Sequence, residues 1–351
     1  MDVAGTGAPD PLDPDPLVVT LTGPRQVEVL PAPRAPLPPG HVRVRTLYSG
    51  ISAGTELTLY RGTNPHLDRR WDPDRRLFVD EAAVSAFPNT AWGYSEVGEV
   101  VELGTGADAA LLGAAVWGLW SHRGEIVLPA GTVADRLLPA GLDPLAGTFA
   151  RVGAVALNAV LAADLHIGET VAVFGQGVIG LIATQLATGS GADVIAVDGI
   201  AARREQAAAF GAPHVLDPVA DDVGERIKEL TGGRGADVIF DPVNGDVFDA
   251  SRRMVAFEGR ILVIGFVAGR FADAPTNHIL VKNYEVVGVH WGFYRQMDPQ
   301  RIPEWQDALN ALWTRRQIDP LVGVELPLRE APEALRRLAS RGTTGKVVLL
   351  P

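Results

Sequence analysis

The sequence predicts an α/β protein of two domains, a β-rich domain followed by a doubly wound parallel sheet. Its 351 residues exceed what one hydrophobic core usually organises, so about two domains are expected. Up to about residue 140, short apolar runs are separated by proline and glycine, which is typical of short strands. From residue 150 onward, apolar strands alternate with helical stretches. This alternation indicates a parallel sheet covered by helices on both faces.

The N-terminal part is predicted to be built from strands. The proline-rich segment 31–40 excludes a long helix, because proline removes a backbone N–H and clashes with the preceding turn. Residues 1–16 have neither a basic start nor an apolar core, so we expect a disordered tail, no secretion signal and a cytoplasmic protein. The predicted strands are 17–21, 26–30, 41–49, 97–103, 115–119 and 124–128.

The second part is predicted to run from a helix at 150–165 through six strands. These strands are 170–174, 192–197, 215–216, 236–240, 259–265 and 286–289, with helices at 201–210, 219–230 and 246–256. Further helices are predicted at 299–316 and 331–338, and the last strand, 345–350, is predicted to return to the first domain. The expected division is therefore 17–148 with 296–351, and 149–295.

Composition excludes several kinds of function. The chain has no cysteine, which rules out disulfides, thiolate metal sites and a cysteine nucleophile. Its seven histidines are scattered and form no paired metal-binding motif, so no catalytic metal is expected. A formal charge of −11 without a basic block disfavours nucleic acid, and no apolar run approaches the roughly 20 residues of a membrane span.

A glycine motif follows the strand predicted at 170–174. It comprises Gly175, Gln176, Gly177, Val178, Ile179 and Gly180. The first glycine permits a tight turn, the second admits a pyrophosphate, and the third lets helix and strand pack closely. Asp198 ends the next predicted strand, where a carboxylate can accept both hydroxyls of a ribose. Together these features predict a dinucleotide site.

The same acid bears on the choice of cofactor. A carboxylate at Asp198 repels a 2′-phosphate, which favours NAD over NADP. Arg203 is also a candidate cofactor contact, and with Arg204 it would oppose this preference if both folded over the adenosine. The alternative, which we favour, is that the two arginines form a solvated helix face. Ligands of such sheets bind at the carboxyl ends of the strands. Further candidate cofactor contacts there are Val243, Asn244, Ile264, Gly265, Phe266 and His290.

Five stretches resemble the medium-chain dehydrogenase/reductase superfamily over nearly the whole chain. They are SGISAGTELTLYRG (49–62), WGYSEVGEVVELG (92–104), VLPAGTVADRLLPAGLDP (127–144), the glycine motif and GTTGKVVLL (342–350). The resemblance implies a GroES-like catalytic domain, a Rossmann domain and NAD(P)-dependent oxidoreductase activity, and it places Lys346 among the cofactor-binding residues. The chain is more loosely similar to bacteriochlorophyllide hydroxyethyl dehydrogenases, whose substrate we do not transfer.

The resemblance departs from the zinc alcohol dehydrogenases at each position that binds the catalytic metal. Ser52 stands near the place of the first cysteine, and Tyr94 replaces the histidine of the GHExxGxV motif. Arg151 stands at the third position. Zn²⁺ requires electron-donating N, S or O ligands, which a guanidinium does not supply. The four-cysteine structural lobe is also missing, so a zinc-free enzyme is predicted.

Tyr94 and Arg151 are the predicted catalytic pair. The phenol of Tyr94 would act as acid or base, with a pKa lowered by a nearby cation. Arg151 would supply that cation or hold an anionic group of the substrate. Thr55 lies near the hydroxyl proton relay of the family, and Glu56 follows it. Purely structural roles remain open, including a packed Tyr94 and an Arg151 paired with Glu56 or Glu96.

The substrate pocket is predicted from aromatic and hydroxyl residues. The candidates are Ser52, Tyr60, Trp92, Trp120 and Trp291, each with a core position as the alternative; Trp117 and His122 are equally ambiguous. The long polar segment 62–91 is predicted to be a lid or a surface elaboration, since loops usually have about 4–6 residues.

The expected activity is the interconversion of a secondary alcohol and a ketone on a functionalised small molecule, such as a sugar, a cyclitol or a biosynthetic intermediate. The alternatives are an NADPH-dependent enoyl or quinone reductase and a dinucleotide-binding protein without turnover. The resemblance also implies a homodimer, joined edge to edge through the strand at 286–289.

Overall fold

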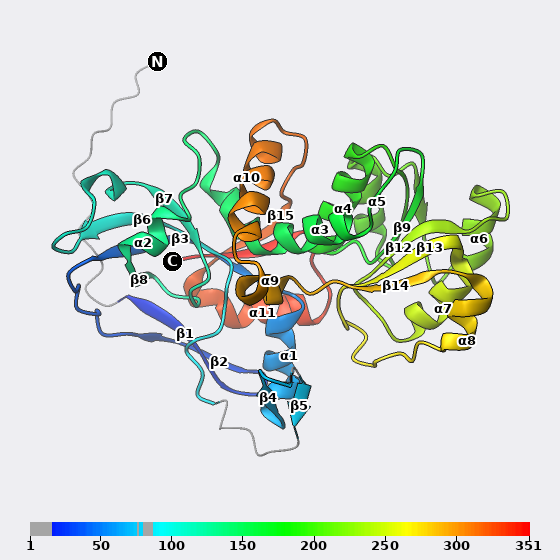
Figure 1. The fold of residues 1–351 in the computed structure, drawn as a ribbon. Helices are drawn as coiled ribbons and strands as arrows, with labels where there is room; N and C mark the ends of the chain where they lie inside the picture. Colours follow the sequence, from blue (N-terminus) through cyan, green and yellow to red (C-terminus); the bar gives the residue numbers. More distant parts are fainter. Residues whose placement is uncertain (1–15, 76, 80–86) are drawn as a thin grey trace.

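The computed structural model describes residues 16–75, 77–79 and 87–351, which fold into two lobes (Figure 1). The tail predicted at 1–16 lies outside these residues except for Pro16, as does part of segment 62–91. In Figure 1 the β-rich lobe lies on the left and the α/β lobe on the right, with α3, α9 and α10 between them. The predicted α/β class with one parallel sheet is confirmed.

The β-rich lobe contains a six-stranded sheet in the order β15-β16-β3-β6-β7, with β8 paired to β3. Its strands are β3 (His41–Ile51), β6 (Glu96–Leu103), β7 (Ala115–Gly118), β8 (Glu125–Pro129), β15 (Val322–Pro327) and β16 (Lys346–Leu350). The end of the chain returns to the first lobe as predicted, because β16 runs antiparallel to β3 with Val347 opposite Ile51. The domain boundaries themselves remain a prediction.

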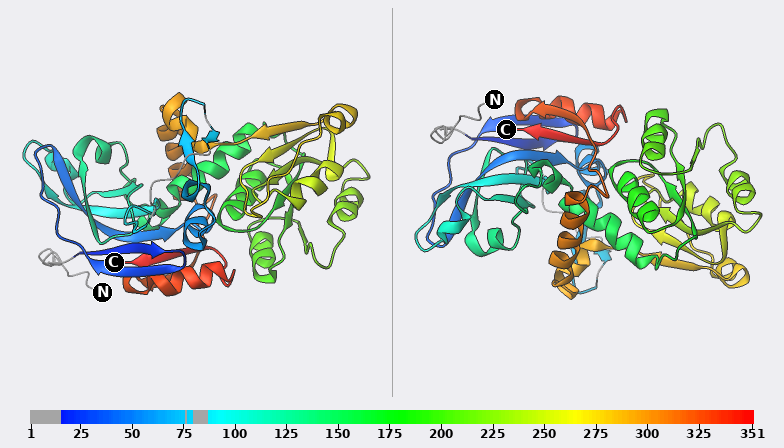
Figure 2. Two further views of the ribbon diagram at one scale, coloured as in Figure 1. Left: turned by 90° about the horizontal axis from the view of Figure 1, so that it is seen from below. Right: turned by 90° about the horizontal axis from the view of Figure 1, so that it is seen from above.

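Smaller elements surround this sheet. They are β1 (Leu17–Gly23), β2 (Gln26–Pro31), α1 (Thr55–Arg61), β4 (Arg70–Asp72), β5 (Leu77–Val79), α2 (Ala130–Ala134) and α11 (Ala331–Ala339). Figure 2 shows α11 and β16 beside the N-terminal strands, where Leu335 and Leu338 share a core with Val19 and Leu21. Helix α1 was not predicted, since seven residues are too few to show a helical period.

The second lobe is a six-stranded parallel sheet in the order β11-β10-β9-β12-β13-β14. Its strands are β9 (Thr170–Phe174), β10 (Asp193–Val197), β11 (His214–Leu216), β12 (Ala236–Asp241), β13 (Val255–Val263) and β14 (Glu285–Gly288). The strand order reverses between β9 and β12. In a doubly wound sheet, ligands bind beyond the carboxyl ends of the strands at such a point.

Helices cover both faces of the parallel sheet. They are α3 (Ala150–Ala162), α4 (Val178–Gly189), α5 (Ala201–Ala209), α6 (Val223–Leu230), α7 (Asp246–Met254), α8 (Thr276–Lys282), α9 (Trp291–Met297) and α10 (Arg301–Thr314). Val171 and Val173 of β9 share one core with α3 and α4, whereas Ala172 and Phe174 share another with α6 and α7. Burial on both faces explains why β9 is apolar throughout. The stretch 144–162 is apolar enough to cross a membrane by length and composition, but 67% of its most apolar window is buried in the protein.

Two predicted boundaries were wrong. Helix α6 begins at Val223 and not at residue 219, because the Asp222 side chain caps it by accepting the backbone N–H of Glu225. Helix α7 ends at Met254, and β13 begins directly at Val255, earlier than the predicted 259. Val255 is β-branched and fully buried in the sheet, and both properties favour an extended backbone at this position.

Candidate functional site

The glycine motif forms a turn shaped for a phosphate group between β9 and α4. Gly175 adopts φ +78°, a conformation that residues with a Cβ avoid. A Cβ at Gly180 would lie 1.9 Å from the carbonyl oxygen of Gly175, so only glycine allows this approach of helix and strand. A Cβ at Gly177 would meet no atom within 4 Å, which leaves room for a ligand against the backbone at the start of α4. The motif therefore fits the pyrophosphate of a dinucleotide.

Asp198 lies beside this turn, at the end of β10. Its carboxylate accepts the backbone N–H of Gln176 at 2.7 Å and that of Ile200 at 2.8 Å. These bonds hold one carboxylate oxygen next to the motif, and each oxygen keeps a further lone pair for a ribose hydroxyl.

The prediction of a solvated face for Arg203 and Arg204 was wrong. Both guanidinium-bearing side chains are only 19% exposed. The Nη1 atom of Arg203 lies 3.7 Å from the Asp198 carboxylate, and the same side chain donates to the carbonyl of Thr343 at 2.8 Å. Arg204 donates to the backbone carbonyl of Asp198 at 2.7 Å and pairs with Asp217 at 3.0 Å. The acceptors around Asp198 draw both arginines inward, so positive charge stands where the adenosine ribose is expected.

The loops after β12 and β13 meet the glycine motif at the carboxyl edge of the sheet. The side chain of Val243 lies 3.5 Å from the Cβ position of Gly175. Asn244 donates its backbone N–H to Asp241 at 2.7 Å, and Ile264 donates to the Asp241 carbonyl at 3.0 Å. Of the predicted contacts on the next loop, Gly265 packs against Pro242 and the half-exposed Phe266 ring packs on Phe271. The structure thus brings these predicted residues together.

Tyr94, Ser52, Thr55 and Arg151 form a second group, where the two lobes meet. The hydroxyl of Tyr94 donates to the Oγ of the buried Ser52 and shares a side-chain hydrogen bond with Thr55. The guanidinium carbon of Arg151 lies 3.8 Å from the centre of the Tyr94 ring. It also lies 5.2 Å from the centre of the Trp291 ring, on α9. His290, just before α9, is exposed, and desolvation together with the charge of Arg151 lowers its pKa.

The predicted lowering of the Tyr94 pKa was wrong. Burial, followed by the negative charge of Glu56, raises the pKa of the phenol above its ordinary value. Arg151 and the hydrogen bonds with Ser52 and Thr55 oppose this shift without overcoming it. Arg151 stacks on the face of the ring instead of pairing with the hydroxyl, so its charge stabilises a phenolate less than a direct ion pair would. Tyr94 is therefore a neutral phenol at neutral pH.

A buried polar cluster lies behind Tyr94, and Glu56 belongs to it. The Nε2 atom of His122 lies 2.8 Å from Glu56 Oε2, and its Nδ1 atom lies 2.7 Å from the hydroxyl of Ser49. Ser49 also donates to Glu96 Oε1 at 3.2 Å. Within the described chain, Glu56 Oε1 and Glu96 Oε2 are buried without a hydrogen-bond partner. Burial and the neighbouring Glu56 raise the pKa of Glu96 well above its ordinary value.

Lys346 belongs to this cluster, and its predicted role at the cofactor was wrong. The side chain is buried, and its Nζ atom lies 5.4 Å from the centre of the Phe149 ring. A Cβ on Gly50 would lie 2.1 Å from Lys346 Cε, so the glycine makes room for the lysine. Burial lowers the pKa of Lys346 to about 8, while Glu56 and Glu96 partly offset that effect. The side chain contacts Gly50 and Phe149 and not the glycine motif.

Three predicted pocket residues are core residues instead. Tyr60 and Trp92 pack in the core that also contains Leu57, and the Trp92 indole donates to the Val19 carbonyl at 3.0 Å. Trp120 lies in a different core, where its indole donates to Thr46 at 3.1 Å. All three rings are buried by apolar neighbours inside the β-rich lobe. Ser52 and Trp291 alone of the predicted pocket set adjoin Tyr94 and Arg151.

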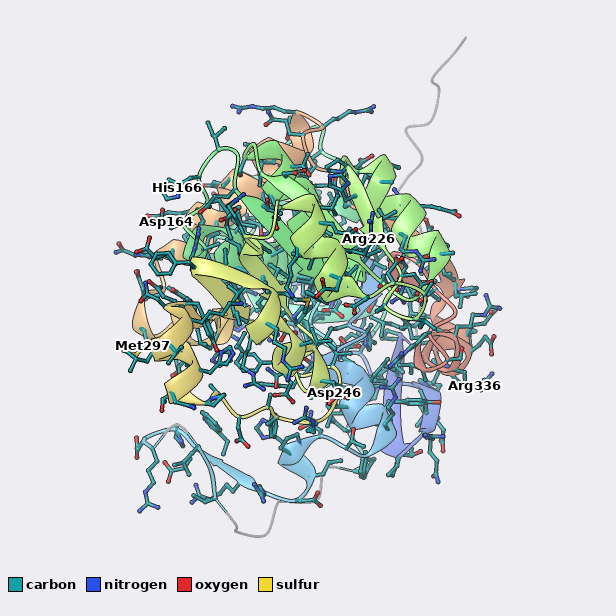
Figure 3. The ribbon with its side chains drawn as sticks, turned by 90° about the vertical axis from the view of Figure 1, so that its right-hand side faces the viewer. Asp164, His166, Arg226, Asp246, Met297 and Arg336 are labelled. Carbon is teal, nitrogen blue, oxygen red and sulfur yellow. The ribbon has the colours of Figure 1, made fainter. Side chains whose placement is uncertain are left out.

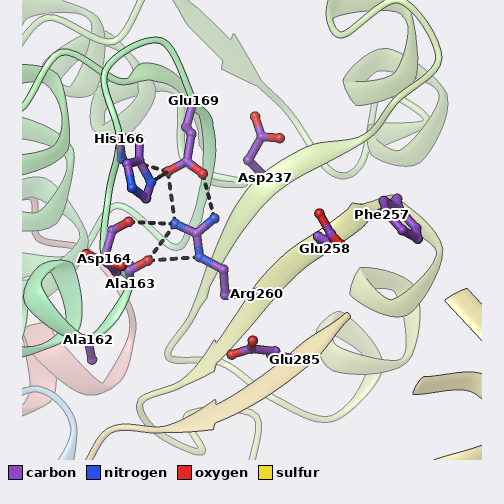
Figure 4. Close-up of a pocket in the computed structure, with 10 residues that line it drawn as sticks. All are labelled: Ala162, Ala163, Asp164, His166, Glu169, Asp237, Phe257, Glu258, Arg260 and Glu285. Atoms are coloured by element: carbon purple, nitrogen blue, oxygen red, sulfur yellow. Dashed lines mark hydrogen bonds and ion pairs between the residues drawn. The ribbon is translucent and has the colours of Figure 1, made fainter. Parts of the chain in front are cut away.

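A hollow of about 440 Å³ lies elsewhere, at the amino ends of the parallel strands (Figure 4). Asp164 and His166 line it and lie together on the outer face of this lobe (Figure 3). Arg260, at the centre of the hollow, donates hydrogen bonds to the Glu169 carboxylate at 2.6 Å and to the backbone carbonyls of Ala163 and Asp164. Because doubly wound sheets bind ligands at the opposite edge, we do not assign this hollow to the active site.

Comparison with known proteins agrees with this architecture. Residues 178–313 match the family described as zinc-binding dehydrogenase. The chain is 32% identical over 269 residues to a quinone oxidoreductase-like protein 2 homolog of Nematostella vectensis, covering 72% of this chain and 71% of that protein. The chain belongs to the medium-chain dehydrogenase/reductase superfamily.

Two further similarities extend the comparison. The chain is also 30% identical over 197 residues to D-guloside 3-dehydrogenase of Escherichia coli. This match covers 54% of the chain and 56% of the relative. The crystal structure of Escherichia coli quinone oxidoreductase complexed with NADPH has a TM-score of 0.76 at 22% identity, covering 95% of this chain and all of the other. At that identity the likeness concerns the fold alone.

Membership in the medium-chain dehydrogenase/reductase superfamily makes this chain an NAD(P)-dependent oxidoreductase. The preference for NAD is not supported by the similar structures, because three of them were solved with NADP or NADPH bound.

The zinc site of the superfamily does not fit the residues found here. The described residues contain no group of three or more His, Asp or Glu side chains arranged to hold a metal ion. Ser52 and Tyr94 bond to each other, and Arg151 brings a positive charge to the same place. This donor set does not match the thiolate, imidazole and carboxylate ligands of catalytic zinc.

Proposed function

We propose that this protein interconverts a secondary alcohol and a ketone on a functionalised small molecule, such as a sugar, a cyclitol or a biosynthetic intermediate, without zinc. The single observation that carries the proposal is the Tyr94 hydroxyl, held by Ser52 beside Arg151 in place of a metal. A bound nicotinamide cofactor would supply or accept the hydride. The protein must then move one proton at the substrate oxygen and stabilise charge there.

The environment of Tyr94 suits proton donation. Its pKa is raised, so at neutral pH the phenol carries the proton that a ketone oxygen needs as hydride arrives at the carbon. The phenolate left behind is stabilised by the charge of Arg151. The exposed hydroxyl of Thr55, bonded to Tyr94, connects the phenol to solvent for reprotonation. Alcohol oxidation requires the phenolate as base and is therefore favoured at higher pH.

The test is a comparison of Tyr94→Phe with Tyr60→Phe, which makes the same change at a core tyrosine. Loss of a general acid lowers turnover by about 10²–10⁴. We expect that loss for Tyr94→Phe in ketone reduction, with NAD(P)H affinity unchanged, and near-normal turnover for Tyr60→Phe. Unchanged turnover of Tyr94→Phe would remove the basis of the mechanism.

A second candidate activity is the NADPH-dependent reduction of a quinone or an α,β-unsaturated ketone. The similarity to a quinone oxidoreductase-like protein over 72% of this chain supports it. The two activities separate by substrate, since a saturated secondary alcohol serves only the first. Oxidation of such an alcohol without reduction of quinones favours the dehydrogenase, and the reverse favours the reductase.

The preference for NAD remains a proposal that rests on Asp198. Its carboxylate lies beside the motif and would repel a 2′-phosphate, whereas Arg203 at 3.7 Å would attract one. Arg203 already donates two hydrogen bonds to the Thr343 carbonyl, which leaves its charge only partly available. Tryptophan-fluorescence titration with NADH and NADPH tests the preference. Tighter NADH binding supports the preference. Tighter NADPH binding would mean that Arg203 and Arg204 bind the 2′-phosphate and outweigh the repulsion by Asp198.

A homodimer joined through β14 also remains a proposal. The strand lies at the edge of the parallel sheet, so its outer backbone groups have no partner strand within the described chain. On the neighbouring helix α8, Leu280 and Val281 are 80% and 86% exposed. A second copy would cover both the edge and these side chains. Light scattering gives the mass directly, and a monomer at micromolar concentration contradicts the proposal.

Segment 62–91 is proposed to cover the site. Trp71 on β4 lies 6.3 Å, centroid to centroid, from Phe293 on α9, the helix that also carries Trp291. The described part of the segment therefore contacts the helix beside Arg151. Residues 80–86 lie outside the described chain.

A further inference from the structure

We propose that the substrate carries an anionic group, a carboxylate or a phosphate, and that Arg136, Arg151 and Arg295 bind it. This inference deepens the proposed alcohol–ketone chemistry and rests on it, because it places the anion next to Tyr94. The three arginines are contributed by α9, by the start of α3 and by the residues that follow α2.

The Arg151 guanidinium contacts two aromatic rings of the site. Its guanidinium carbon is 3.8 Å from the centre of the Tyr94 ring and 5.2 Å from that of Trp291. Aromatic rings contact the flat face of a guanidinium and leave the N–H groups in its plane for another acceptor. Among the described residues, no carboxylate lies within 4.0 Å of Arg151, and the side chain is half-buried.

Arg295 lies near enough to Arg151 and to Arg136 for its charge to act on both. Arg295 is exposed one helical turn beyond Trp291 on α9, so both point to the same side of that helix. Arg136 stacks on Trp117 at 5.3 Å, and Trp117 packs against Ala150, the neighbour of Arg151. Besides burial, the charge of Arg295 lowers the pKa of both other arginines.

Such a cluster is unusual in this chain, which has 42 acidic and 31 basic residues. Several arginines elsewhere are paired with carboxylates, as the buried Arg43 is with Glu102 and Glu125. Around Arg151 the nearest acids, Glu56 and Glu96, are instead turned into the cluster formed with His122. Three cations that repel one another, with no ion pair in the described chain, are stabilised when an anion binds.

The position of the cluster separates it from the phosphate turn. The glycine motif offers its own backbone N–H groups to a pyrophosphate, whereas Arg151 contacts the two rings beside the reacting hydroxyl. Trp291 adds an indole N–H that is buried without a partner among the described residues. We therefore assign the arginines to the substrate and not to the cofactor.

The test uses three probes that share a polyol chain: gluconate, glucitol 6-phosphate and neutral glucitol. Binding to the NADH-saturated full chain is measured by calorimetry, which requires no turnover. We expect one anion to bind at least about tenfold more tightly than glucitol, since a hydrogen bond to a charged group contributes roughly 1.5–3 kcal/mol. The preferred anion distinguishes a carboxylate from a phosphate.

Arg151→Gln and Arg295→Gln should each reduce anion binding about tenfold or more, and Arg151→Lys should restore only part of it. Arg253→Gln, an exposed arginine on α7, is the matched control and should bind as the parent does. Arg295 is exposed as well, so its variant tests the cluster without disturbing a core.

Four outcomes overturn the inference. Neither anion binds, glucitol binds as tightly as the anions, or the arginine variants leave anion binding unchanged. Equal weakening of NADH binding in these variants assigns the cluster to the cofactor phosphates and overturns it too. None of these outcomes depends on whether Tyr94→Phe retains turnover, so failure here is distinct from failure of the proposed function.

Discussion

Replacing Lys346 by methionine should stabilise the protein, and the gain should depend on pH. The side chain is buried beneath Gly50, and no carboxylate of the described chain lies within 4.0 Å of its ammonium group. Methionine has a similar length and needs no counter-charge.

The size of the effect follows from the pKa. Burial lowers the pKa of Lys346 from 10.5 to about 8. Each unit corresponds to about 1.4 kcal/mol, so the charged lysine lowers the free energy of unfolding by at most about 3.5 kcal/mol below pH 8. Between pH 8 and 10.5 the unfolded chain binds a proton that the folded chain does not. The stability of the parent therefore rises with pH through this window, and the variant lacks that rise.

The assay is urea unfolding of the parent and of Lys346→Met at intervals from pH 7 to pH 10. The difference in unfolding free energy should shrink as the pH increases, and Lys228→Met, at an exposed lysine on α6, should show no such trend. Removing the cation also removes its attraction for the side chains of Glu56 and Glu96, so the gain at pH 7 falls below the upper bound. Parallel pH profiles for the parent and Lys346→Met would refute the reasoning.

Three other perturbations test different parts of the site. Gly180→Ala places a Cβ 1.9 Å from the Gly175 carbonyl and should lower stability by about 1–3 kcal/mol and abolish NADH binding, as seen by thermal unfolding and fluorescence titration. In Glu96→Gln, a carboxyl group whose pKa is raised in the folded protein is lost. That group makes the parent less stable as the pH rises above the pKa of glutamate in the unfolded chain. In urea unfolding, the stability of the variant should therefore depend less on pH from about pH 5 upward. Trp71→Ala removes the contact with Phe293 and should raise the substrate KM more than it changes NADH affinity, whereas equal effects would argue against a cover.

Local requirements explain which parts could be predicted. The glycine motif was recognisable because positive φ at Gly175 and the missing Cβ at Gly180 are conditions on single positions. The apolar strand 170–174 was recognisable because burial on both faces removes polar residues from every position. Short elements such as α1 and α9 escaped prediction, because seven residues span about two helical turns and show no clear period.

The candidate site was only partly predictable. The resemblance to zinc alcohol dehydrogenases pointed to Ser52, Tyr94 and Arg151, and the structure places them together. The aromatic candidates could not be sorted, because a tryptophan that lines a pocket and one that fills a core have the same local pattern. Trp291 adjoins Arg151 while Trp120 is buried elsewhere, and only the packing of distant segments distinguishes them.

The sequence by itself determined the parallel sheet, the dinucleotide turn and the absence of thiolate ligands, since each depends on residue type and spacing along the chain. The tertiary structure decided the protonation of Tyr94, the inward turn of Arg203 and the place of Arg151 between the rings of Tyr94 and Trp291. These properties depend on burial and on charges contributed by residues far apart in the sequence, such as Glu56, Arg151 and Arg295. Because Coulomb interactions and desolvation vary with distance in space, no pattern along the chain could reveal their sign.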